Sequence, residues 1–256
     1  LKDPDAVQRD IANFRAGLEG TSPHDTFMTA ASPGVIAAFL ENHYYPTEEA
    51  YLAALADAMR PEYEAIVNSG FTLQIDCPDL AMSRQMGSLA SASTEDFRRS
   101  AAQHVEALNH AVANIPADSM RMHVCWGNWE GPHDGDVPLS DTIDIILRAK
   151  PAAVSLEAAN PRHAHEWQVF QDVKLPEGKM LIPGVIESTS NYVEHPEVVA
   201  QRILNYARLV GRENVMAGSD CGFGTFVGVY GVEPRVLWRK FESMAEGARL
   251  ASQRLW

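Results

Sequence analysis

The feature of this sequence that most constrains its fold is an alternation of strand-like and helix-like patterns along the whole chain. Runs typical of strands are 26–32, 71–76, 121–125, 152–157, 179–186 and 214–219. Helical patterns occupy 4–18, 47–68, 95–114, 140–149, 162–171, 196–210 and 233–251, and Pro61 is expected to kink or divide the second of them. Repeated strand–helix units predict an α/β fold with a parallel sheet.

Two parallel architectures fit this alternation. A (β/α)8 TIM-type barrel has eight units in about 250 residues, and only six are visible, so the first one or two βα units would be absent from this chain. An open doubly wound sheet needs five or six strands, usually with a glycine-rich turn after the first. The segment 30–39 (AASPGVIAAF) has one glycine, which favours the barrel. No linker divides the chain, so we expect 1–256 to be one barrel domain that is incomplete at its N-terminus.

Charge and cysteine content narrow the function. The chain has 34 acidic and 21 basic residues, a net charge of −13, which argues against nucleic acid or an anionic membrane surface as a partner. The chain has only three cysteines, Cys77, Cys125 and Cys221. This small, odd number argues against a disulfide framework. The first twenty residues do not resemble a signal peptide. We therefore expect a cytoplasmic protein with reduced thiols.

Nearly every residue whose side chain could bind a ligand or take part in catalysis falls at the carboxyl end of a predicted strand. In parallel α/β folds these ends share one rim, where active sites form. Ser32, Asp76 and Asn128 are candidates for substrate binding, and Asp76 and Glu187 for catalysis. The full set at this rim is Ser32, Asp76, Cys77, His123, Cys125, Asn128, Glu157, Glu187, Asp220 and Cys221.

The tripeptide His123-Val124-Cys125 indicates a metal site. Residues two apart on a strand point to the same side, so the imidazole and the thiol face one pocket. Zinc prefers such ligands in tetrahedral geometry. Cys221 is the candidate third ligand and Glu157 a weaker, displaceable fourth, although a buried cysteine is more often an inert packing residue.

The remaining polar residues have simpler interpretations. Asp76 at a strand end is suited to accept hydrogen bonds from a substrate ammonium, whereas its neighbour Cys77 is expected to pack in the core. His163 and His165 diverge on a predicted helix and are expected on the surface. His133 lies in a glycine-rich loop and is expected to be solvated.

Five segments together resemble the catalytic domain of cobalamin-independent methionine synthase. They are LQIDCPDLA (73–81), HVCWGN (123–128), SLEAANP (155–161), PGVIES (183–188) and SDCGFGTF (219–226). The resemblance implies a zinc-dependent (β/α)8 barrel that moves a methyl group from a folate to the sulfur of homocysteine. It implies the zinc ligands His123, Cys125, Glu157 and Cys221, with Glu157 displaced by the substrate sulfur. It also implies that Asp76 contacts the amino group of the thiol substrate.

The sequence departs from that family in ways that leave alternatives open. Thr189 stands where the folate-using enzymes carry a histidine thought to protonate the leaving folate, and Glu187 or His195 would have to replace it. A corrinoid donor, which needs no such acid, and an alkyl transfer of the epoxyalkane:coenzyme M type are alternatives. In each case the partners are a small-molecule thiol and a methyl or alkyl donor.

A different interpretation starts from the missing strands. A truncated, non-catalytic homologue would expose two sheet edges, which further chain or a second copy in a homo-oligomer would have to cover.

Overall fold

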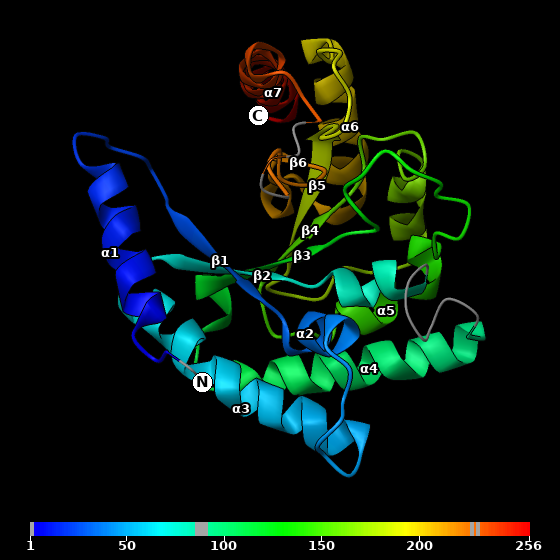
Figure 1. Cartoon of the computed structure of the whole chain (residues 1–256). Coiled ribbons are helices and arrows are strands. Elements are labelled where there is room, and N and C mark those ends of the chain that lie inside the picture. The colour runs from blue at the N-terminus through cyan, green and yellow to red at the C-terminus, as the bar shows by residue number, and fades with distance from the viewer. Residues whose placement is uncertain (1–2, 85–91, 226–227, 229–230) are drawn as a thin grey trace.

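A computed structural model describes residues 3–84, 92–225, 228 and 231–256. Within these residues, six strands form one curved sheet (Figure 1). They are β1 (Phe27–Ala31), β2 (Thr72–Asp76), β3 (Met120–Val124), β4 (Ala153–Leu156), β5 (Met180–Ile186) and β6 (Gly218–Ser219). Each strand pairs in parallel with the next one along the chain. The strand order β1-β2-β3-β4-β5-β6 has no reversal, so the doubly wound alternative is wrong.

Helices precede, connect and follow the strands and cover one face of the sheet (Figure 1). They are α1 (Ala6–Leu18), α2 (Pro33–Phe39), α3 (Glu48–Asn68), α4 (Thr94–Ala111), α5 (Ile143–Ile146), α6 (Pro196–Val210) and α7 (Pro234–Leu255). The main core packs the sheet against α3 and α4, and a second cluster packs β5 against α6 and α7. The parallel α/β class is therefore confirmed.

The sheet has the strand order of a barrel but does not close in the described residues. β1 pairs only with β2, and β6 only with β5. The described part of the chain is a half-barrel, and the complete (β/α)8 barrel stays a prediction.

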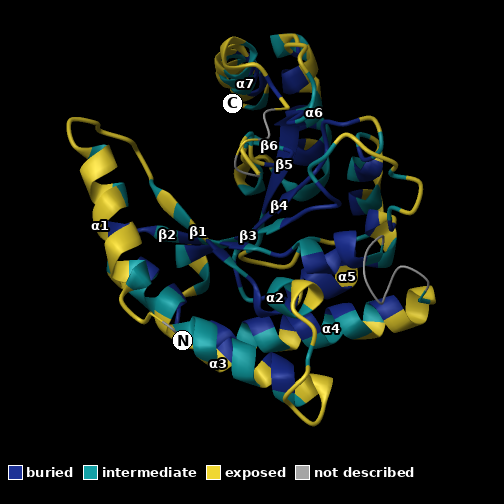
Figure 2. Ribbon diagram, in the orientation of Figure 1, coloured by how far each residue is buried: buried dark blue, intermediate teal, exposed yellow. Residues whose placement is uncertain are grey.

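Residues alternate between the two faces of the central strands. In β2 and β3, Leu73, Ile75 and Met122 are fully buried against the helices. Between them, Gln74 and His123 are less buried and, by the alternation of a strand, belong to the opposite, concave face of the sheet. Figure 2 shows that the strands consist mainly of buried and intermediate residues. This alternation shows that the concave face carries the polar side chains.

Three local expectations were wrong. The segment after β1 is not a plain turn but the short helix α2, because Ser32 accepts a hydrogen bond from Val35 N and Pro33 stands in the first turn. Pro61 does not divide α3, which runs without a break from Glu48 to Asn68.

The expected helices 140–149 and 162–171 are mostly turns and 3-10 segments, with only Ile143–Ile146 α-helical. In the second of these segments, buried hydrogen bonds of His163 and Glu166 replace a regular helical face.

Candidate metal centre

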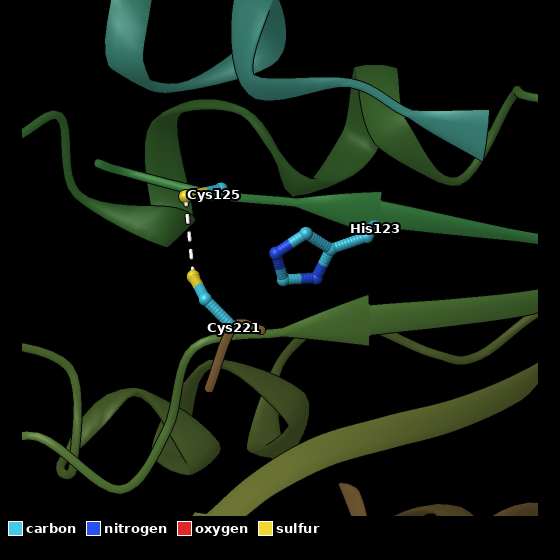
Figure 3. Close-up of side chains that lie close together, drawn as sticks. All are labelled: His123, Cys125 and Cys221. Carbon is cyan, nitrogen blue, oxygen red and sulfur yellow. Dashed lines mark hydrogen bonds between the residues drawn. The ribbon is translucent and has the colours of Figure 1, made fainter. Parts of the chain in front are cut away.

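Three predicted ligands come together at the carboxyl end of the sheet. His123 is on β3, Cys125 directly follows that strand, and Cys221 follows β6. One ligand atom from each lies within 4.8 Å of the other two. Figure 3 shows the two sulfurs facing each other and the imidazole directed toward them. Residues 96 positions apart in the sequence thus share one small site.

The chemical state of these residues suits a metal. Burial, with a smaller contribution from Arg121, lowers the pKa of His123 to about 4, so the ring is neutral at pH 7. Its Nδ1 lies 3.3 Å from the Ser155 hydroxyl, which leaves Nε2 available as a ligand. Gly127 N donates a hydrogen bond to Cys125 Sγ at 3.1 Å, so the backbone helps to hold this sulfur in place.

The donor set fits zinc. The Sγ atoms of Cys125 and Cys221 are 3.2 Å apart, and both cysteines are free. Two thiolates on one tetrahedral zinc ion would stand about 3.8 Å apart, so small side-chain shifts suffice. The neighbouring Cys125 thiol and burial both raise the pKa of Cys221, and a bound cation is the group that reverses such a shift.

Glu157, the predicted fourth ligand, lies beside this group, but both of its carboxylate oxygens accept hydrogen bonds from other residues. Its Oε1 is 3.7 Å from Cys221 Sγ and accepts a hydrogen bond from Trp126 N at 2.7 Å. Its Oε2 accepts hydrogen bonds from Asn160 and Arg162. Ligation by Glu157 therefore stays a prediction.

Asp220 fixes the loop that carries Glu157. Its carboxylate accepts hydrogen bonds from the backbone N–H groups of residues 158, 159 and 160 at 2.7 to 2.8 Å. Burial raises the pKa of Asp220 to about 6, and the charge of Glu157 adds to the effect. Gly184 on β5 permits this arrangement, because a Cβ there would lie 2.0 Å from Asp220 Oδ1. Asp220 thus ties the segment after β4 to the segment after β6.

Asp76 lies next to His123 in the sheet, since the two residues are register partners. Its side chain accepts a hydrogen bond from Gln74 at 3.0 Å. Burial raises its pKa, although Gln74 and Arg121 oppose the shift. Asp76 is thus placed beside the candidate metal ligands, where substrate recognition would require it.

Ser32 and Asn128 are held by the protein itself. Ser32 donates to Asp79 at 2.7 Å and caps α2. Asn128 donates to Gly222 O at 2.7 Å and to Thr225, and accepts from Ser188 at 2.8 Å, so it joins three rim loops. Substrate contact by either residue stays a prediction.

Glu187 organises its own loop. Its carboxylate accepts hydrogen bonds from Thr189 and Ser190. Burial alone would raise its pKa, but these hydrogen bonds outweigh burial and lower it. An ionised Glu187 has no proton to give at neutral pH, which argues against it as a general acid. The alternative acid, His195, is exposed at the start of α6 and accepts from Glu197 N.

A buried ionic network beside Glu157 was missed by the sequence reasoning. Arg162 contacts Asp136 at 2.6 Å, and Asp136 also contacts His163 at 3.2 Å. His163 is buried and the His133 side chain is only 7% exposed, so the surface and solvated assignments of these two histidines were wrong. The Asn-Pro pair before Arg162 was the available signal, because it indicates a loop rather than a helix.

The fold and the site together define a class: a parallel α/β half-barrel that gathers an imidazole and two thiols at the carboxyl ends of its strands. The family model described as the catalytic domain of cobalamin-independent synthase matches residues 35–229. The chain belongs to this family, and the predicted resemblance is confirmed.

Individual relatives agree with the family. The chain is 26% identical to a methionine synthase of Thermococcus kodakarensis over 246 residues, which cover 96% of this chain and 63% of the relative. It is 24% identical over 143 residues, 46% of this chain and 38% of the relative, to a 2-hydroxypropyl-CoM lyase of Xanthobacter autotrophicus. The chain therefore spans less than two thirds of the length of these relatives.

A solved structure supports the same fold. A B12-independent methionine synthase from a Shewanella species, solved in complex with selenomethionine, superposes with a TM-score of 0.74 at 16% identity. The superposition covers 96% of this chain and 67% of that one.

Among the described helices, none has the length and apolar character that a membrane span requires.

Proposed function

We propose that this chain is a zinc-dependent methyltransferase domain that activates a homocysteine-like thiol for S-methylation. The observation that carries the proposal is the convergence of His123, Cys125 and Cys221 within 4.8 Å. The family implies a methyltransferase and is zinc-dependent in general. Zinc, when bound, lowers the pKa of a thiol ligand so that a thiolate is available at neutral pH.

The protein's own residues would divide the work as follows. His123, Cys125 and Cys221 hold the metal, with Glu157 as the fourth, displaceable ligand. Asp76 accepts hydrogen bonds from the ammonium group of the substrate and so places its sulfur at the rim. Asn128 holds three rim loops together, which keeps the site in shape while the donor binds.

A second candidate is alkyl transfer to coenzyme M. The similarity to a 2-hydroxypropyl-CoM lyase favours it, as does Thr189, which offers no strong acid for a folate leaving group. Both candidates share thiol activation and differ in the thiol and the electrophile.

The first experiment is zinc per chain, by elemental analysis of protein purified under reducing conditions. The cobalt-substituted protein is then titrated with homocysteine and, separately, with 2-mercaptoethanesulfonate, and the sulfur-to-metal charge-transfer band is recorded. One metal and a response to homocysteine support methionine synthase-like chemistry. A response only to 2-mercaptoethanesulfonate favours the second candidate. Absence of bound metal contradicts both.

A further inference from the structure

The two carboxylate oxygens of Glu157 contact different partners. Oε1 faces Cys221 at 3.7 Å and accepts Trp126 N. Oε2 accepts hydrogen bonds from Asn160 Nδ2 at 2.9 Å and from Arg162 Nη2 at 3.0 Å. The Glu157 side chain is 2% exposed, so its neighbours and not water must stabilise its charge.

Arg162 is held in place from its other side. Its Nη1 lies 2.6 Å from Asp136 Oδ2 and 2.6 Å from His133 Nδ1. Asp136 in turn contacts His163, whose second nitrogen lies 2.9 Å from Glu166. The guanidinium is thus fixed between two carboxylates, and its planar fork suits this geometry better than an ammonium would.

The charges at the site give Arg162 a specific task. Two cysteine thiolates and Glu157 carry three negative charges against two positive charges of a zinc ion. A substrate thiolate in the place of Glu157 would add a fourth negative charge, and the carboxylate would stay buried. A buried carboxylate without a cationic partner is strongly unfavourable, and Arg162 is the cation in contact with it among the described residues.

We propose that Arg162 is a positioning residue that holds the Glu157 carboxylate and compensates its charge when a thiol takes its place. The inference rests on the proposed function. It explains why Glu157 has a resting place beside the thiols, and it makes Arg162 a determinant of thiol affinity rather than of metal affinity.

The test compares Arg162→Ala and Arg162→Lys with a matched control, Arg202→Ala. Arg202 donates to the carbonyl oxygens of Ala159 and Val185, so it supports the same loop without touching Glu157. Metal per chain and zinc affinity are measured by elemental analysis and chelator competition. Homocysteine and 2-mercaptoethanesulfonate are titrated into the cobalt-loaded proteins, below the melting temperature of each variant.

Arg162→Ala is expected to keep one metal with an affinity no weaker than wild type. Its thiol affinity is expected to fall by about tenfold or more, because the displaced carboxylate has lost its partner. Arg162→Lys should recover part of that loss, and Arg202→Ala should bind thiol as wild type does.

Unchanged thiol affinity in Arg162→Ala overturns the inference. So does loss of metal in that variant, or an equal fall in thiol affinity in Arg202→Ala, since either would reveal general support of the loop. Wild-type protein that binds no metal or neither thiol overturns the proposed function together with this inference. The two failures are therefore told apart by the wild-type measurement.

Discussion

Two largely buried polar clusters lie near the carboxyl ends of the strands, and they differ in how their polar atoms are hydrogen-bonded. The first consists of Ser32, Asp79 and His104, each less than a tenth exposed. Asp79 accepts from Ser32 at 2.7 Å and contacts His104 Nδ1 at 3.0 Å. The second is the group of His123, Cys125 and Cys221.

We call the first cluster closed, because its polar atoms have strong hydrogen-bond partners within the protein, and the second open, because its sulfurs do not. Both carboxylate oxygens of Asp79 have protein partners, and Ser32 also caps α2. The sulfurs of the second cluster contact each other, the backbone N–H of Gly127 and, at 3.7 Å, a carboxylate oxygen of Glu157. Sulfur is a poor hydrogen-bond partner but a strong ligand for zinc. The comparison teaches that burial and polarity alone do not identify a metal site. Potential ligand atoms that lack strong hydrogen-bond partners in the protein do.

The largest expected effect follows from removing a ligand of the open cluster. Cys221→Ala should lose essentially all bound zinc, because the two remaining members of the group, His123 and Cys125, would hold the metal weakly. Elemental analysis measures the zinc, and circular dichroism checks the fold. The control is Cys77→Ala, which removes a buried thiol outside the group and should keep one zinc per chain. Full zinc in Cys221→Ala would break the distinction between the clusters.

The closed cluster should respond in stability and not in metal content. Asp79→Ala leaves Ser32 and His104 buried without their shared partner, and we expect it to lower the free energy of unfolding by about 3 kcal/mol. Urea unfolding measures this change. Zinc per chain should stay at the wild-type value, and a parallel loss of zinc would show that the two clusters are coupled.

The ionic network behind Glu157 adds a pH dependence of its own. Burial opposes a charged His163, but the hydrogen bonds that its ring donates to the carboxylates of Asp136 and Glu166 outweigh burial and raise its pKa to about 9. Because this value lies above the ordinary 6.5, the stabilisation is complete below about pH 6.5 and is lost as the pH rises through about 9. The expected contribution is about 3 kcal/mol at most.

Urea unfolding between about pH 6 and pH 9.5 tests this dependence. The wild-type protein should lose stability over that range, and His163→Gln should show a flatter profile. Equal slopes for the two proteins would remove His163 as the source.

The smallest effect concerns recognition beside the open cluster. Asp76→Asn should weaken homocysteine binding by about tenfold, or about 1.4 kcal/mol, because the amide lacks the charge that attracts an ammonium. The binding of 2-mercaptoethanesulfonate, which has no amino group, should not change. Thiol titrations of the cobalt-loaded protein measure both, and equal losses would exclude Asp76 from amino-group recognition.

The sequence predicted the sheet better than the helices. Five of the six strands lie within the predicted runs, because continuous apolar segments mark buried parallel strands strongly. The segment 162–171 was predicted as a helix and is mostly a 3-10 turn. Its apolar spacing resembled a helical face, whereas its structure follows from buried contacts with loop 126–139 that lie far away in sequence.

For the site, strand periodicity and position were sufficient to bring three ligand candidates together. His123 and Cys125 share a strand face, and Cys221 ends a strand on the same rim. Arg162 was missed because no local pattern reveals a side chain that turns back to a residue five positions earlier.

The close approach of Asp220 to Gly184 limits how sequences of this type can diverge. A side chain at position 184 would occupy the space of the Asp220 carboxylate, and a smaller residue at 220 would release the backbone of residues 158–160. Glycine at 184 is required whatever residue stands at 220, because a Cβ there would also lie 2.7 Å from the Cα of residue 220.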